Sequence, residues 1–281
     1  MSEIAGRTIL ITGAASGIGR RLAQAASRDG AAVVLWDIDR EGLDRIAGEL
    51  RAHASLRVHA MTVDVASREA VCTAASRVRS TAGPVDILVN NAGVVSGRML
   101  LDLRDDQIET AFAVNTLALY WTTRAFLPAM IERGRGHIVT MASAAGLVGV
   151  SRQTDYSASK HAAVGFDESL RYELRRIAPG VRTTVVCPFY VDTGLFDGVK
   201  SRFPRLLPIL DESAVAERVM RAVRRNEPRV ILPPLVRLMP IARALPVSVF
   251  DRLIDFFGVN VGMDEFRGRG DTLTATRRTT G

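Results

Sequence analysis

The residues best suited to chemistry in this chain are a tyrosine and a lysine four positions apart, Tyr156 and Lys160. In a helix this spacing places both side chains on the same face. A free tyrosine titrates near ~10, and a neighbouring ammonium favours the phenolate, which would bring proton exchange closer to working pH. Tyr156 is therefore a candidate acid/base, although the same spacing also occurs on ordinary solvated helix faces.

A glycine-rich turn lies between an expected strand at residues 8–11 and a helical pattern that runs through Ala26. Its spacing is G-x-x-x-G-x-G. Glycines allow backbone N–H groups to approach a pyrophosphate at the positive end of a helix, but a glycine cluster can also be only a tight turn. The context favours cofactor binding, and the expected contacts are Gly13, Ser16, Gly17, Ile18 and Gly19.

The next buried strand, residues 31–36, ends in Asp37. A carboxylate at this position can accept hydrogen bonds from a ribose diol and repels a 2′-phosphate, so NAD is favoured over NADP. Arg20 and Arg40 are evidence against this preference, because either could reach a phosphate. Ala15, however, leaves the glycine turn itself without a basic residue.

Strands and helices alternate along the rest of the chain. This alternation predicts an α/β fold in which a doubly wound, Rossmann-like parallel sheet of seven strands carries helices on both faces. Ligands bind such sheets at the carboxyl ends of the strands. Further expected strands are residues 56–63, 85–89, 136–141, 181–187 and 229–232, and polar or cofactor-contacting residues at strand ends are Gly13, Asp37, Asp64 with Val65, Asn91 and Ser143.

A long helix is expected over residues 105–132, and it contains Asn115 on an apolar face. A buried amide must find hydrogen-bond partners. Asn115 is therefore either a satisfied core amide or a distortion that holds water for proton transfer. His137 begins the strand at residues 136–141, opposite the ligand edge, and is expected to be structural.

Residues 12–19 and 90–93, with Asn115, Ser143, Tyr156 and Lys160, resemble the short-chain dehydrogenase/reductase family in order and spacing. The resemblance covers about residues 5–195. It implies that Tyr156 is the acid/base of an alcohol/carbonyl oxidoreductase and that Ser143 hydrogen-bonds the reacting oxygen. It also implies that Lys160 binds the nicotinamide ribose and lowers the pKa of Tyr156, while Asn115 supports a water relay.

After the strand at residues 181–187, Phe189 occupies a place where the family usually has glycine. This departure leaves Val191 and Thr193 as the expected nicotinamide contacts. Residues 194–210 are irregular and apolar between basic positions, and we expect a substrate lid there.

The C-terminal extension, residues 233–266, is apolar but contains regularly placed arginines. Val249, Leu253, Phe256 and Phe257 form a helical stripe that could pack on its own domain, on a dimer partner or on a membrane surface. This extension resembles retinol dehydrogenases and lipid-droplet 17β-hydroxysteroid dehydrogenases. We expect one Rossmann-type domain over residues 1–266 and a disordered tail at 267–281.

Composition limits the classes of protein. The 281 residues include 47% hydrophobic and 24% charged residues, which is ordinary for a globular protein. Cys72 and Cys187 show no metal-ligand spacing, so we expect free thiols and no metal site. We also expect a cytoplasmic location with possible peripheral contact with a membrane. The strand at residues 8–11 leaves no room for a signal peptide.

The net charge of +7 is spread over many segments, so no nucleic-acid partner is expected. The expected partners are a lipophilic substrate and further copies of the chain in a homodimer or homotetramer. The alternative to an enzyme is a catalytically silent NAD-binding sensor on the same fold. A sensor would have no need of Ser143, Tyr156 and Lys160 together.

Overall fold

The computed structural model describes residues 4–53 and 57–268, so the tail expected to be disordered lies almost wholly outside the described residues. Within them, a seven-stranded parallel sheet has the order β3-β2-β1-β4-β5-β6-β9. The order reverses between β1 and β4, where such sheets bind ligands. The predicted doubly wound sheet is therefore confirmed. Its strands are β1 (Thr8–Thr12), β2 (Ala32–Asp37), β3 (Val58–Thr62), β4 (Ile87–Asn90), β5 (Gly136–Met141), β6 (Val181–Pro188) and β9 (Arg229–Leu232).

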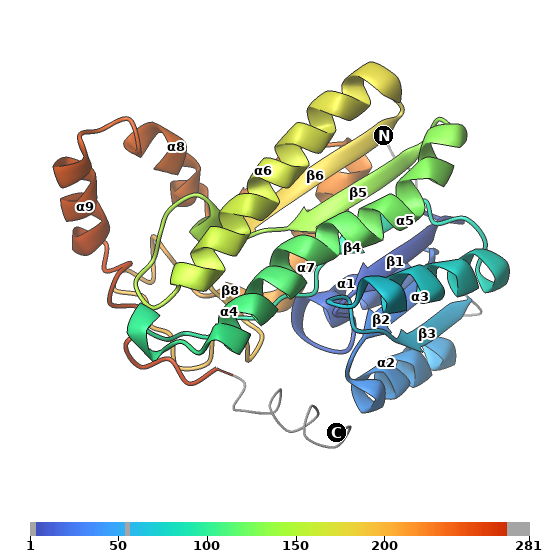
Figure 1. Ribbon diagram of the computed structural model, residues 1–281, viewed down its shortest axis with the longest axis horizontal. Helices are drawn as coiled ribbons and strands as arrows, with labels where there is room; N and C mark the ends of the chain where they lie inside the picture. Colours follow the sequence, from blue (N-terminus) through green and yellow to red (C-terminus); the bar gives the residue numbers. More distant parts are fainter. Residues whose placement is uncertain (1–3, 54–56, 269–281) are drawn as a thin grey trace.

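Helices cover both faces of the sheet (Figure 1). Side chains alternate between the faces along each strand, so Ile9 and Ile11 pack on one side and Leu10 on the other. Because both faces are covered, the strands are almost continuously apolar. One layer contains α1 (Gly17–Arg28), α2 (Arg40–His53) and α7 (Glu212–Arg225), and the other contains α3 (Arg68–Thr81), α5 (Ala118–Glu132) and α6 (Thr154–Ile177).

The expected long helix is divided by a π-helical turn at Ala113–Leu117, between α4 (Asp105–Phe112) and α5. Asn115 lies in this turn and is buried. A π-turn adds one residue to the helical repeat and often marks a functional site. The distortion considered from the sequence is therefore present. Short 3-10 turns at Leu100–Asp102 and Ala144–Gly146 follow β4 and β5.

Two short strands that the sequence pattern did not indicate close the base of the expected lid. β7 (Val191–Asp192) pairs in parallel with β8 (Leu210–Asp211). Asp211 then caps α7 by accepting a hydrogen bond from the backbone N–H of Ala214 at 2.8 Å. The segment of residues 194–209 therefore begins and ends beside the paired strands β7 and β8.

The C-terminal extension contains a 3-10 turn (Pro234–Leu238), α8 (Met239–Ala242) and α9 (Val247–Phe256). In Figure 1 both helices stand to one side of the sheet. The expected apolar stripe of α9 does not form one buried face, because Ile254 is buried whereas Val249 and Phe256 are 44% and 57% exposed. Among residues 4–53 and 57–268, no helix is long and apolar enough to cross a membrane.

Candidate active site

The glycine turn after β1 forms a cradle that has no space for side chains. Gly13 has a φ of +66°, and a Cβ there would lie 2.9 Å from the Cα of Ala92. A Cβ on Gly19 would lie 1.9 Å from the carbonyl oxygen of Gly13. Ser16 precedes α1 and makes no side-chain capping bond, so the N–H groups of the first turn are left for another acceptor. Ser16, Gly17, Ile18 and Gly19 are therefore placed as an anion-binding turn requires.

Asp37 lies at the end of β2, beside this turn. Its Oδ2 accepts a hydrogen bond from the backbone N–H of Ala15 at 2.9 Å, and its Oδ1 accepts one from Asp39 at 3.0 Å. The carboxylate therefore holds the glycine turn against the strand end. At the end of β3, Asp64 is exposed and accepts from Ala66 at 2.9 Å, whereas the side chain of Val65 is buried in the core.

Asn91 lies below the glycine turn. Its Nδ2 donates to the carbonyl oxygens of Thr12 at 2.9 Å and Gly13 at 3.1 Å. The amide nitrogen thus joins the end of β4 to the turn. The structure therefore gives this side chain a positioning task in addition to the expected place near the cofactor.

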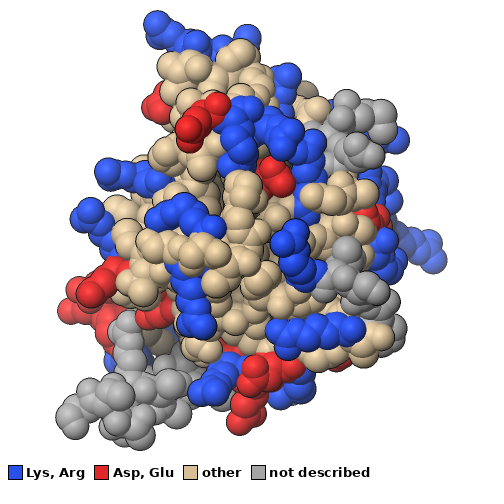
Figure 2. Space-filling model, turned by 90° about the vertical axis from the view of Figure 1, so that its right-hand side faces the viewer, with Lys and Arg blue, Asp and Glu red and all other residues tan. Residues whose placement is uncertain are grey.

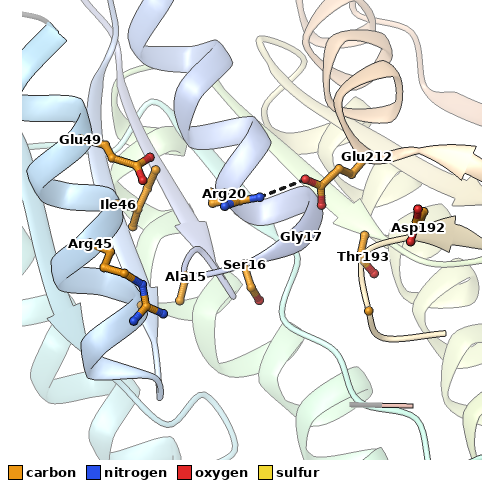
Figure 3. A pocket seen from close by; sticks show the side chains of 12 residues that line it. Ala15, Ser16, Gly17, Arg20, Arg45, Ile46, Glu49, Asp192, Thr193 and Glu212 are labelled. Atoms are coloured by element: carbon orange, nitrogen blue, oxygen red, sulfur yellow. Dashed lines mark hydrogen bonds and ion pairs between the residues drawn. The ribbon is translucent and has the colours of Figure 1, made fainter. Parts of the chain in front are cut away.

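A cavity of about 420 Å³ opens over the glycine turn (Figure 3). Ser16 and Gly17 line it from α1, Thr193 lines it from the segment after β7, and Val191 is buried close by. Glu212 at its edge accepts hydrogen bonds from Arg20 at 3.2 Å and Arg21 at 2.6 Å.

Arg20, which the sequence offered as a phosphate ligand, is already paired with the Glu212 carboxylate at the edge of this cavity. Glu212 and Arg45, which also line the cavity, were not anticipated, because nothing in the local sequence relates α2 and α7 to the turn.

Tyr156 and Lys160 lie on the buried face of α6, each 4% exposed. Lys160 Nζ is 5.6 Å from the centre of the Tyr156 ring and donates to the carbonyl oxygen of Met141 at 2.8 Å. Burial lowers the pKa of Lys160 to about 8. Burial raises the pKa of Tyr156 to about 12, opposed by a hydrogen bond with Ser143.

The expected lowering of the Tyr156 pKa is therefore wrong for this state of the protein. The physical reason is that desolvation of a fully enclosed phenolate outweighs the hydrogen bond from Ser143, while the Lys160 ammonium bonds to a backbone carbonyl. The phenol consequently keeps its proton at neutral pH.

Asn115 is also a fully bonded amide. Its Oδ1 accepts from the backbone N–H of Val94 at 2.9 Å, and its Nδ2 donates to Val94 O at 2.9 Å and to Ser159 Oγ at 3.0 Å. The amide is thus satisfied, as the first alternative predicted, and it lies in a helix distortion, while the water relay stays a prediction. The amide connects α6, one turn past Tyr156, to the segment after β4.

A second connection between the same two segments was missed. Ser96 Oγ donates to Asp155 Oδ2 at 2.5 Å, and Asp155 is only 4% exposed although it is a carboxylate. In the sequence, only the position of Asp155 directly before Tyr156 suggested that this carboxylate belongs to the site. Its partner lies 59 residues earlier, which no local pattern reveals.

Aromatic rings cover the phenol. Phe196 meets Tyr156 edge to face at 5.7 Å and 82°, and Tyr190 contacts Phe196 at 5.2 Å. Phe189, the departure from the family pattern, packs against Tyr190 at 4.6 Å. His137 is buried far from this group, where Nε2 pairs with Thr184 Oγ1 at 2.8 Å.

Known proteins show the same organisation. Residues 7–202 match the family model for short chain dehydrogenase. The chain is 41% identical to epidermal retinol dehydrogenase 2 of Mus musculus, covering 95% of this chain and 87% of the relative, and 38% identical to retinol dehydrogenase 10 of Bos taurus, covering 94% and 86%.

Solved structures agree with these sequence matches. A short chain dehydrogenase/reductase from Burkholderia phymatum in complex with NAD superimposes with a TM-score of 0.79 at 28% identity, covering 87% of this chain and 95% of that one. The chain therefore belongs to the short-chain dehydrogenase/reductase family.

Proposed function

We propose that this protein is an NAD(P)-dependent oxidoreductase that interconverts an alcohol and a carbonyl on a lipophilic substrate, with Tyr156 as acid/base. The observation that carries the proposal is the enclosed group of Ser143, Tyr156 and Lys160 beside the glycine cradle. A nucleotide-binding sensor would not require a buried phenol bonded to a serine hydroxyl. An enzyme and a nucleotide-binding sensor on this fold would both bind the cofactor, but only the enzyme would turn over a substrate.

The roles of the residues follow from their surroundings. A bound nicotinamide supplies or accepts the hydride. In the reductive direction Tyr156, protonated at neutral pH because its pKa is about 12, gives its proton to the substrate oxygen. Ser143 donates a hydrogen bond where the alkoxide charge develops. Lys160 offers its ammonium to a ribose, and Asn115 holds the segment that borders the phenol.

The turn suits a dinucleotide, since glycine at positions 13 and 19 permits its close packing on Asn91 and Ala92, and no side chain caps the first N–H groups of α1. We propose NAD as the preferred cofactor because Asp37 faces the end of the cradle with a carboxylate, and Thr193 and Val191 as contacts of the nicotinamide side. Asp64, Val65 and Asn91 border the adenine side at the ends of β3 and β4.

Asp37→Ala should narrow the preference for NAD over NADP, because the change removes a negative charge that repels a 2′-phosphate. The Ala15 N–H loses its acceptor as well, so affinity for both nucleotides should fall. The measurement is kcat/KM for each nucleotide. Glu173→Ala, which removes an exposed carboxylate on α6 outside the nucleotide site, is the matched control. An unchanged NAD/NADP ratio in Asp37→Ala would assign the selection to Arg40 or Arg45.

The lipophilic substrate is supported by the rings of Phe189, Tyr190 and Phe196 around the phenol, and by relatives whose names specify retinol. We propose that residues 194–210 act as a lid over a steroid, retinoid or long-chain alcohol. Each buried CH₂ contributes about 0.8 kcal/mol, so kcat/KM should rise with chain length across a series of primary alcohols. Equal values from short to long alcohols would reject the lipophilic site.

We further propose peripheral contact with a membrane through α8 and α9. Ile241, Val247 and Phe256 are 72%, 75% and 57% exposed, and Arg243 and Arg252 lie among them in the sequence. Apolar side chains beside cations suit an anionic lipid surface.

The free thiols of the described residues support a cytoplasmic location. The exposed side chains of Phe112, Leu117 and Tyr120 support a homodimer or homotetramer, which sedimentation velocity would test.

The protein should float with vesicles that contain anionic lipid and remain at the bottom with neutral ones. Replacing Val247 and Phe256 together by serine should abolish flotation, because the pair removes exposed apolar area without changing charge. Tyr172→Ser, at a half-exposed position on α6, is the control. Recovery of the wild-type protein only in the pellet would reject membrane contact.

A basic nucleic-acid binder is the less favoured alternative. On the face shown in Figure 2, Lys and Arg are spread in separate groups with other residues between them. Nucleic-acid grooves instead combine a continuous basic surface with aromatic platforms. A salt-dependent shift of DNA mobility would revive this alternative.

A further inference from the structure

Among the described residues, Phe196 is the aromatic ring that packs against the Tyr156 ring. On its other sides Phe196 meets Tyr190 at 5.2 Å and Phe266 at 6.5 Å, both nearly edge to face. Tyr156 is only 4% exposed in this arrangement. An apolar group that approaches the phenol from this side must therefore replace the Phe196 ring, and the side chains that now contact that ring become its neighbours.

Phe266 is one of these neighbours, although it lies 110 residues after Tyr156 in the C-terminal segment. Its ring sits directly on Gly97, where an added Cβ would lie 2.1 Å from a ring carbon. Gly97 has a φ of +68°, which favours glycine on its own account. Ser96 beside it is hydrogen-bonded to Asp155, the residue before Tyr156. The position of the Phe266 ring is thus set relative to the phenol.

The backbone on both sides of this contact is held in place. The N–H of Arg267 donates to Asp197 O at 2.8 Å, and the N–H of Lys200 donates to Gly262 O at 3.1 Å. Lys200 Nζ also pairs with Glu265 at 2.6 Å. These backbone bonds join residues 197–200 to residues 262–267 without involving the Phe196 side chain, so a rotation of that side chain would leave them, and the seat of Phe266 on Gly97, intact.

From this geometry we propose that Phe266 is a specificity-determining residue of the substrate site, supplied by the C-terminal segment and seated on Gly97. The inference rests on the proposed function, since it concerns the alcohol that approaches Tyr156. Its ligand is an apolar body whose portion next to the reacting carbon meets aromatic ring edges. A planar ring in that place regains the edge-to-face contacts that Phe196 gives up, and a saturated ring does not.

The test compares 3-phenyl-1-propanol with 3-cyclohexyl-1-propanol, which have the same carbinol group and the same number of heavy atoms. Phe266→Leu keeps an apolar side chain but removes the ring. The ratio of kcat/KM for the phenyl over the cyclohexyl alcohol should fall by about two- to tenfold, the value of one aromatic pair. Phe256→Leu is the matched control, because this ring of the C-terminal extension contacts Phe203 and Phe257 instead of Phe196. Its ratio should equal that of the wild type.

Gly97→Ala provides a second variant, because an added methyl group must push the Phe266 ring from its seat. It should reproduce the loss of phenyl preference. An equal fall of kcat/KM for both alcohols in Phe266→Leu, with an unchanged ratio, would show a structural role only and overturn the proposal.

The two proposals can fail separately. If the wild-type protein turns over neither alcohol with NAD or NADP, the proposed function fails for this substrate class. Dissociation constants of the two alcohols from calorimetry then still test Phe266. The same fall in the binding ratio supports the inference, and an unchanged ratio overturns it.

Discussion

Tyr156→Phe is expected to lose turnover by a factor of roughly 10² to 10⁴ while NAD binding is kept. The phenylalanine ring retains the packing against Phe196, so the enclosed site keeps its shape. What disappears is the proton that the phenol holds at neutral pH and that, in the proposed function, it gives to the substrate oxygen. Steady-state kcat with saturating NAD, together with a titration of NAD binding, separates the two effects.

The matched control is Tyr190→Phe. This second buried tyrosine has a pKa that burial also raises, and its hydroxyl accepts a hydrogen bond from Gln153 Nε2 at 3.3 Å. It does not contact Lys160 or Ser143 in any interaction described above, so kcat should change little. If both variants retain wild-type turnover, Tyr156 is not the acid/base.

Asp167→Asn is expected to stabilise the protein at alkaline pH. Asp167 lies fully buried on α6, and burial raises the pKa of its carboxyl to about 7, opposed by hydrogen bonds from Thr183 and Thr140 and by the charges of Arg171 and Arg229. In the unfolded chain the same group titrates near 3.8. Between these two values the folded protein holds a proton that the unfolded chain has lost, so stability falls as pH rises through the folded pKa.

One pKa unit corresponds to about 1.36 kcal/mol, so the wild type should lose about 3 kcal/mol between pH 5 and pH 8 through this group. Asparagine cannot ionise and should not show that loss. Urea unfolding of both proteins at pH 5, 6, 7 and 8 measures the difference in the free energy of unfolding. That difference should grow with pH and level off above pH 7.

Glu173→Gln is the control, because Glu173 is exposed on the same helix. Its stability should follow the wild type at every pH. Parallel curves for Asp167→Asn and the wild type would mean that Asp167 is ionised in the folded protein throughout this range.

The fold was predictable because its signals are local and repeated. The apolar run Thr8–Thr12, the glycines after it and the caps of the helices each depend on neighbours within a few residues. The β7/β8 pairing was not predictable, since a two-residue ladder has no periodicity to detect. What covers the apolar stripe of α9 could not be predicted, because such a stripe indicates amphipathicity but does not identify its partner.

The identities of the site residues were predictable from the sequence, but the burial around them was not. The spacing of Tyr156 and Lys160 indicated a shared face, and the structure confirms that placement. The direction of the Tyr156 pKa depends on how completely the phenol is enclosed, which only packing determines. On α6, Asp167 is buried together with Ala163, Leu170 and Leu174. A carboxylate in the core could not be inferred from composition.

The pairing of β7 with β8 at the base of the 194–210 segment affects how easily the length of this segment can change in evolution. Val191 aligns with Leu210, and Asp192 with Asp211, so the two ends of the intervening loop are already joined before the loop adopts any conformation. Closing a flexible loop costs free energy that grows only with the logarithm of its length, and doubling the length adds only about 0.6 kcal/mol. A change in the length of this loop therefore adds little closure free energy. Its main cost is the loss of the contacts between residues 197–200 and residues 262–267, and the nucleotide half of the molecule is left intact.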